Sequence, residues 1–280
     1  MAYTYVTEES MQMFADLIKQ NPEQSISFPN DFISEFGNVC DYANQISESE
    51  IYNFICTSSS FTTFSNSNIT FKCSVLRPYA FYCFSKSTLL SFPKCKIIKP
   101  YCFNKATIYN LYIPECEYVC SAAFAEAKLS VLALYRCSVI EKEAFYNSTL
   151  KFIRLELPLT VGENAFAACR SLDGAVIGSK HKGTDPSIYS CIISSYAFLG
   201  CNSLASIRIT NCREFGANVF KGCKDGLRIW LDGSKVPIID LSNSFPYGTK
   251  IIVGSSMISA YRNNSRWRTF GGYIYSRDGV

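Results

Sequence analysis

The feature that most restricts the fold of this 280-residue chain is a residue pair, small then Phe, that recurs at nearly constant spacing. The phenylalanines of these pairs are separated by 22, 21, 21, 21, 32 and 22 residues. A unit this short cannot bury its own apolar face, so the period predicts a stack of repeats. We call these residues the repeat phenylalanines: Phe81, Phe103, Phe124, Phe145, Phe166, Phe198 and Phe220.

Apolar residues precede each repeat phenylalanine at fixed distances. Counting back from the Phe, they occupy positions −16, −13 and −11, with a small or sulfur-containing residue often at −8 and an apolar residue at −5. Before Phe145, Leu132 and Leu134 hold positions −13 and −11. Residues two apart share one face of a strand, so we expect short parallel strands that pair between units. Positions −5, −1 and 0 are expected to form a second, turn-like wall.

The unit before Phe198 is longer than the others. Its strand begins at Leu172, 26 residues before the phenylalanine, where the template expects 16. About ten residues, 178–187 (GSKHKGTDPS), are therefore predicted to form an inserted surface loop, because they are rich in Gly, Pro and charge. Such insertions are often functional in repeat proteins, and a neutral length variation explains the loop equally well.

Several segments carry the template in recognisable form. They read LYIPECEYVCSAAF, LELPLTVGENAFAAC, IISSYAFLGCNSLASIRI and FGANVFKGCKDGLRIWL. In these segments the chain resembles the BspA-like family of leucine-rich repeats, and the resemblance covers roughly residues 69 to 270. The C-terminal sequence is similar to the closing unit of such proteins, in which a strand, a short helix with Ala-Tyr and a Trp end the stack. Gly254 stands where Pro usually follows the strand.

The predicted fold class is a repeat solenoid. The resemblance implies a leucine-rich-repeat-like right-handed stack with short parallel strands on one face, an N-terminal helix and a C-terminal capping unit. The expected parts are an amphipathic helix in 1–21, an atypical region in 22–68, the solenoid in 69–226 and the closing unit in 227–280. Region 22–68 is interpreted either as degenerate repeats or as a small second domain.

The predicted N-terminal helix runs from residue 7 to residue 20. Thr7 can cap it, Glu8 and Glu9 suit its positive end, and Asn21-Pro22 ends it. Its apolar stripe consists of Met11, Phe14, Ala15, Leu17 and Ile18. The helix is interpreted either as a cap over the first repeat or as an element for homo-oligomerisation or virion attachment.

Eight of the fourteen cysteines follow the structural period. One set falls at position −8 (Cys73, Cys95, Cys116, Cys137 and Cys212), and a second falls three residues after the Phe (Cys169, Cys201 and Cys223). There is no C-x-x-C pair, so zinc-ligand spacing is missing and no metal site is expected. We therefore predict free, buried thiols and a reducing compartment, while disulfides between neighbouring units stay geometrically open.

Composition argues against several classes of function. Only 18 % of the residues are charged and the net charge is +4, so the clustered Lys and Arg of a nucleic-acid-binding protein are absent. No run of about 18 apolar residues occurs, and no membrane span is expected. The N-terminal sequence MAYTYVTEESMQMFADLIKQ lacks the basic and apolar regions of a secretory signal.

The sequence also offers no catalytic motif. It contains no G-x-S-x-G, Walker A, G-x-G-x-x-G or H-E-x-x-H pattern. The single histidine, His181, lies in the polar insertion and is interpreted as a solvated loop residue rather than a catalytic partner of Cys191. We expect a non-enzymatic protein without a cofactor.

The outward positions of the strands, −14, −12 and −10, supply the candidate binding residues. Position −12 holds Tyr112, Arg154 and Arg208, and position −10 holds Tyr135. Aligning Leu227 and Ile229 with −13 and −11 adds Arg228 to the −12 column and Trp230 to the −10 column. Arg and Trp are enriched at binding hot spots, and Arg suits carboxylate or phosphate. The alternative is an ordinary solvated sheet face.

The resemblance implies a module that binds a protein or glycan ligand, commonly at a cell surface. Without a recognisable secretory signal, the sequence favours a bacteriophage virion component for fibre, decoration or host recognition, folded in the host cytoplasm. That expectation rests on analogy between folds. A cell-surface adhesin of a bacterium or protist is the alternative, and a cytoplasmic scaffold and an enzyme rank below both.

Overall fold

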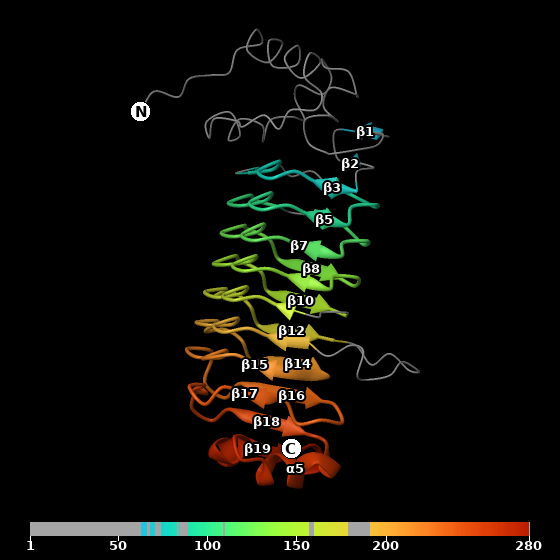
Figure 1. The fold of residues 1–280 in the computed structure, drawn as a ribbon. Coiled ribbons are helices and arrows are strands. Elements are labelled where there is room, and N and C mark those ends of the chain that lie inside the picture. The colour runs from blue at the N-terminus through green and yellow to red at the C-terminus, as the bar shows by residue number, and fades with distance from the viewer. Residues whose placement is uncertain are drawn as a thin grey trace.

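The computed structural model describes residues 63–65, 68–70, 74–82, 84, 89–108, 110–156, 160–178 and 191–279. The predicted helix at 7–20 and all but the first residue of the predicted insertion at 178–187 lie outside these residues. Within them the chain forms an elongated solenoid, whose turns, called rungs below, lie one below another in Figure 1. The prediction of a repeat solenoid is confirmed.

One wall of the solenoid carries the strands predicted from positions −13 and −11. A four-stranded sheet contains β1 (Thr63–Ser65), β2 (Asn68–Thr70), β4 (Leu89–Ser91) and β6 (Asn110–Tyr112). A seven-stranded sheet contains β8 (Val131–Leu134), β10 (Phe152–Leu155), β12 (Gly174–Ile177), β14 (Ser206–Thr210), β16 (Arg228–Asp232), β18 (Lys250–Val253) and β19 (Ile274–Ser276). Strands β1 and β2 pair antiparallel and the other neighbours pair parallel. We call the outer side of this wall the strand face.

The second wall was expected to be turn-like, and it is also a parallel sheet. It consists of β3 (Val75–Leu76), β5 (Ile97–Ile98), β7 (Tyr118–Val119), β9 (Val139–Ile140), β11 (Thr160–Val161), β13 (Cys191–Ile193), β15 (Cys212–Phe215) and β17 (Ile238–Ile239). Val119 and Ile140 at position −5 point inward, whereas their neighbours Tyr118 and Val139 are half-buried on the outside. The expectation of strands on one face only is therefore wrong, because the residues that end at position −5 form a second set of short strands.

The inward and outward residues of the first wall alternate as predicted. Leu132 and Leu134 of β8 are buried, as are Ile153 and Leu155 of β10. Their neighbours on the strand face are exposed or half-buried. The inward residues of all rungs join one hydrophobic core that runs from β3 to the C-terminal helices.

The repeat phenylalanines form a continuous stack inside this core. From Phe81 to Phe220 the centroids of successive rings lie 5.0, 5.0, 4.9, 5.0, 5.2 and 5.8 Å apart. Phe166 and Phe198 are 32 residues apart in sequence and still stack at 5.2 Å. The stack of rings in the core is therefore continuous across the longer unit. Phe245 extends the stack at 6.2 Å from Phe220.

The turns that carry these rings are linked from rung to rung by backbone hydrogen bonds. The N–H of Phe124 donates to the carbonyl of Ala144 at 2.7 Å, and the N–H of Phe145 donates to that of Ala165 at 2.7 Å. From Phe103 to Phe220 the backbone is left-handed two residues before and two residues after each ring, and it is left-handed two residues before Phe81. The non-glycine residues with positive φ at these two positions are Tyr79, Tyr101, Lys105, Ala122, Glu126, Glu143, Asn147, Asn164, Ala168, Tyr196 and Asn218.

The cysteine columns are packing positions, as predicted. Cys116, Cys120, Cys137, Cys169, Cys191, Cys201, Cys212 and Cys223 are free, and all of these except the half-buried Cys212 are buried. At position −8, Cys116 and Cys137 donate to the carbonyls two residues on. Cys201, which follows Phe198 by three residues, donates to the carbonyl of Phe166 in the preceding unit at 3.0 Å. The thiols thus satisfy backbone acceptors of the rungs.

The C-terminal end is closed by short helices, confirming the predicted capping unit in outline. They are η2 (Ser255–Met257), α5 (Ile258–Asn263), η3 (Trp267–Tyr273) and η4 (Arg277–Gly279). Trp267 is 1 % exposed and its indole N–H donates to the carbonyl of Pro237 at 2.6 Å. Figure 1 shows α5 across the last rung. Among the described residues no helix is long and apolar enough to cross a membrane.

Candidate binding surface on the strand face

The register of β16 differs from the predicted one by two residues. Ile207 of β14 pairs with Ile229, and Arg208 pairs with Trp230. Leu227, Ile229 and Leu231 are all buried at two-residue spacing, so the pattern allows two registers that keep the same side chains outside. The predicted alignment of Leu227 with position −13 is therefore wrong, because Leu227 precedes the strand and Ile229 takes that position.

The corrected register brings two predicted site residues into contact. Trp230 lies in the −12 column beside Arg208, and the Arg208 guanidinium carbon is 5.3 Å from the centroid of the indole. This is a cation–π contact on a half-buried ring. Arg228 moves to the −14 column, where its neighbours across the sheet are Ser206 and Lys250. All three residues stay on the strand face.

A buried carboxylate holds this cluster together. Asp232 ends β16, and its side chain is 5 % exposed. One oxygen lies 3.7 Å from Nε of Arg208, and the other pairs with Arg277 of η4. Since Arg277 is 45 residues further along the chain, this ion pair ties the C-terminal helices to β16, near the C-terminal end of the strand face. The same carboxylate limits the freedom of the Arg208 side chain above Trp230.

Another cation–aromatic pair lies on the next strands. The ammonium of Lys250 is 5.4 Å from the centroid of the Tyr275 ring. Ile252 lies between Trp230 and Tyr275 in the −12 column and is fully buried, although it points to the strand face. Its burial shows that side chains on this face pack against one another rather than standing separately in solvent.

The remaining predicted residues lie apart from this cluster. Arg154 pairs with Glu156 of its own strand segment, with Nε 3.0 Å from the carboxylate, and Val176 separates it from Arg208. Tyr112 belongs to the four-stranded sheet and is 53 % exposed. Tyr135 follows β8 and is 48 % exposed. The predicted set is thus divided into a C-terminal group, one isolated ion pair and two N-terminal tyrosines.

Several members of the cluster were not predicted. They are Asp232, Lys250, Ile252, Tyr275 and Arg277. The columns could have been continued by aligning KIIV (250–253) and IYS (274–276) with the earlier strands, since each has apolar residues at the inward positions. Nothing in the sequence indicates the pairing of Arg277 with Asp232, because it depends on the path of the cap.

The second wall carries a separate polar contact on its outer side. Tyr118 donates to one oxygen of Glu141 at 2.6 Å, and the N–H and hydroxyl of Ser121 donate to the other at 2.7 and 2.8 Å. Burial alone raises the pKa of Glu141, but these hydrogen bonds outweigh it and lower that pKa below its ordinary value. The hydrogen bond to Glu141 in turn raises the pKa of Tyr118 to about 12.

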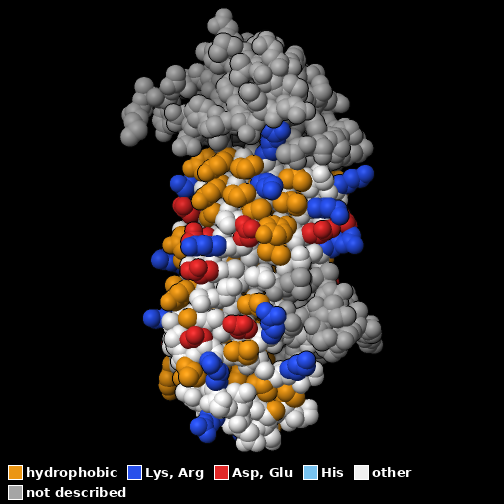
Figure 2. All heavy atoms as spheres, viewed as in Figure 1, with side chains coloured by type: hydrophobic (Ala, Val, Ile, Leu, Met, Phe, Trp, Pro, Cys, Tyr) orange, Lys and Arg blue, Asp and Glu red, His pale blue; other side chains and the backbone are white. Residues whose placement is uncertain are grey.

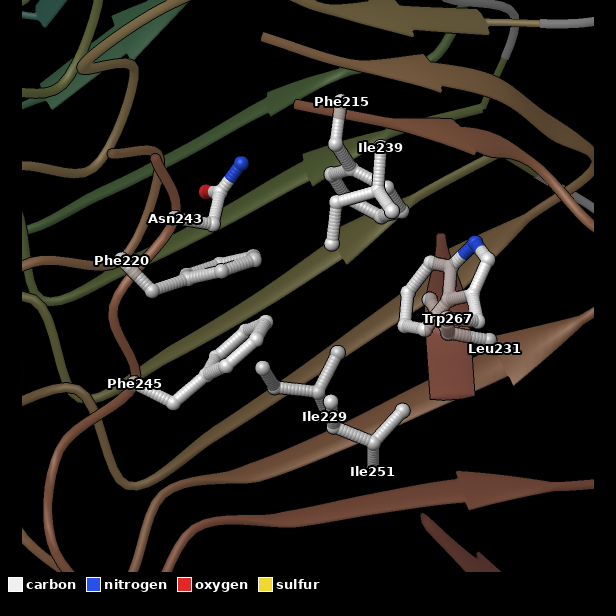
Figure 3. A pocket seen from close by; sticks show the side chains of 9 residues that line it. All are labelled: Phe215, Phe220, Ile229, Leu231, Ile239, Asn243, Phe245, Ile251 and Trp267. Carbon is white, nitrogen blue, oxygen red and sulfur yellow. The ribbon is translucent and has the colours of Figure 1, made fainter. Parts of the chain in front are cut away.

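The interior near the C-terminus contains a small void rather than a ligand site. Figure 3 shows Phe220, Phe245, Ile229 and Trp267 around it, and its volume of about 10 Å³ suits one water molecule at most. Asn243 is the polar residue that lines the void. Its side-chain oxygen accepts a hydrogen bond from the N–H of Val219, and its side-chain NH₂ donates to the carbonyl of Gly216. Among the described residues, no group of three or more His, Cys, Asp or Glu side chains could hold a metal ion.

The middle of the chain matches a known family of repeats. Residues 134–236 match the BspA type leucine-rich repeat region, in six copies. This segment is therefore similar to BspA-type repeats. They contain Arg154, Arg208, Arg228, Trp230 and Asp232, whereas Lys250 and Tyr275 lie beyond the matched BspA-type segment. A comparison with curated proteins found no match.

Proposed function

We propose that this chain is a non-enzymatic binding protein whose strand face recognises a protein or glycan ligand. BspA-type repeats suggest a protein-binding or adhesin role, and the match covers most of the candidate residues. The observation that carries the proposal is the contact of Arg208 with Trp230, flanked by Arg228, on an accessible sheet face. Cations and aromatic rings of this kind dominate the energetics of binding interfaces.

The proposed setting is a bacteriophage virion, in which the protein folds in the host cytoplasm and serves as a fibre, decoration or host-recognition component. The alternative is a BspA-like adhesin at the surface of a bacterium or protist. The proposed attachment or oligomerisation element is the N-terminal segment 7–20. Detection of the protein in purified virus particles, rather than on the surface of the cells that encode it, would support the first setting; the opposite distribution would support the second.

The proposed binding face can be tested with a photo-reactive residue placed on either wall of one rung. Ser206 of β14 is exposed on the strand face, and Arg213 of β15 is exposed on the second wall. After incubation with intact candidate host or target cells and irradiation, a cross-linked partner is expected from position 206 and not from 213. Cross-linking from 213 alone, or from neither position while the unmodified protein still binds, would contradict the proposal.

A further inference from the structure

We propose that the C-terminal end of the strand face, formed by Arg208, Arg228, Trp230, Lys250 and Tyr275, docks an acidic segment of a partner protein. This inference rests on the proposed function and specifies the chemistry of the ligand. The five residues lie on β14, β16, β18 and β19, and two of them, Lys250 and Tyr275, lie beyond the matched repeats. We call these five residues the cationic patch.

Charge on this part of the face is unbalanced. Four cations project there from β14, β16, β18 and η4: Arg208, Arg228, Lys250 and Arg277. The carboxylates that these elements carry are those of Asp232, which is buried and shared between Arg208 and Arg277, and Asp278 of η4, which accepts a hydrogen bond from Ser255. Arg228 is exposed and forms no ion pair with the residues that the structure describes. The excess positive charge suits an anionic partner.

The aromatic rings of the patch hold cations in place. Arg208 lies over Trp230, and Lys250 lies over Tyr275, at 5.3 and 5.4 Å from the ring centroids. One face of each ring is thus already covered by a cation, so the groups presented to a ligand are guanidinium and ammonium rather than two open stacking platforms. This arrangement favours carboxylates over stacking of a neutral sugar.

The cations are also positioned before any ligand arrives. Asp232 restrains Arg208 from below, and the buried Ile252 fills the space between Trp230 and Tyr275. Arg228 and Lys250 are direct neighbours on adjacent parallel strands. Long basic side chains lose less conformational entropy on binding when their stems are packed in advance. Because Arg228 and Lys250 are adjacent, the two cations can take the side-chain carboxylates of one short acidic segment.

The test uses poly-L-glutamate as the probe and compares two double variants of the full chain. Arg228→Gln with Lys250→Gln removes two charges from the patch. Arg170→Gln with Lys224→Gln removes two charges from exposed turn residues four positions after repeat phenylalanines. We expect the patch variant to bind about tenfold more weakly or worse, and the control variant to bind as the parent does. Poly-L-glutamine should not bind.

Three results would overturn the inference. The first is that poly-L-glutamate does not bind the parent protein. The second is that both double variants lose the same affinity for poly-L-glutamate, because binding would then depend on net charge alone. Tighter binding of hyaluronate than of poly-L-glutamate, lost in the patch variant, would assign the patch to acidic glycans instead. In each case cross-linking from position 206 still tests whether the strand face binds a ligand at all, so the two failures are distinguishable.

Discussion

The rings of Phe124 and Phe145 stack at 4.9 Å with their planes 1° from parallel. Both rings are fully buried, and each contacts the equivalent ring on its other side. Phe145→Ala should therefore lower the free energy of unfolding by about 3–5 kcal/mol, because it leaves a cavity that neighbouring rungs cannot fill. Denaturant titration measures the loss. Phe152→Ala, which removes a partly exposed ring of the strand face, is the control; an equal loss there would contradict a dominant role of the stack.

The buried thiols should be protected from alkylation in the folded protein. Burial raises the pKa of the Cys169 thiol to about 11, against the lowering effect of its hydrogen bonds with Ser148, and Cys169 donates to the carbonyl of Phe145 at 2.9 Å. Reaction with iodoacetamide followed by mass spectrometry should find Cys169 and Cys201 unmodified in the native state. After denaturation all fourteen cysteines should react. Rapid modification of Cys169 without unfolding would contradict the packing role.

The left-handed turns offer a matched pair of substitutions. Ala168 and Gly200 both follow a repeat phenylalanine by two residues, with φ of 58° and 70°. Gly200→Ala should lower stability by about 1–2 kcal/mol, since a Cβ there meets no atom within 4 Å and the cost is backbone strain. Ala168→Gly should raise stability, because glycine removes the strain of positive φ, and its greater loss of conformational entropy on folding offsets part of that gain. Thermal unfolding of the two variants should shift in opposite directions; a shift in the same direction would refute the argument.

The Glu141 contact predicts a pH dependence of stability. Its pKa is lowered in the folded state relative to an ordinary glutamate value of 4.5, so its contribution is present above that value and is lost as the pH falls through the folded pKa. Glu141→Gln should therefore be less stable than the parent at neutral pH, and the difference should shrink in acid. Denaturant titrations at several pH values measure it. Glu163→Gln, which removes an exposed carboxylate, is the control for loss of charge alone, and an equal loss of stability at neutral pH in that variant would contradict the role of the Glu141 contact.

Much of the fold could be predicted from the positions that repeat. The spacing of the phenylalanines predicts the stack, and the two-residue spacing of Leu132 and Leu134 predicts the inward face of β8. Both are confirmed because burial of a repeated apolar residue is a local requirement that every rung meets in the same way. The second sheet was harder to predict, since its strands are as short as two residues and periodicity over that length carries little information.

The candidate surface depended on details that the pattern leaves open. Leu227, Ile229 and Leu231 keep the same face in either of two registers, and only pairing with Ile207 decides between them. In the register predicted from the sequence Trp230 would lie beside Thr210, whereas in the observed register it lies beside Arg208. The ion pair between Asp232 and Arg277 depends on tertiary contacts across 45 residues, which no local pattern encodes.

Composition predicted the mixed surface of the solenoid more directly. Figure 2 shows basic and acidic side chains interspersed on the face in view, with hydrophobic side chains gathered toward the end that carries β3. A net charge of +4 over 280 residues is consistent with this mixture. A local excess of charge such as the cationic patch is invisible in the total, because it arises from which strands become neighbours.

The parallel pairing of the strands also sets a limit on the length of any partner segment. Neighbouring strands of a sheet lie about 4.8 Å apart, so the columns of the strand face repeat at that spacing. Side chains on one face of an extended peptide recur at about 6.6–6.8 Å. A peptide laid along the solenoid axis therefore falls out of step with the columns after about two rungs. We expect short epitopes to be matched well, whereas lengthening the peptide should add little affinity unless its backbone bends.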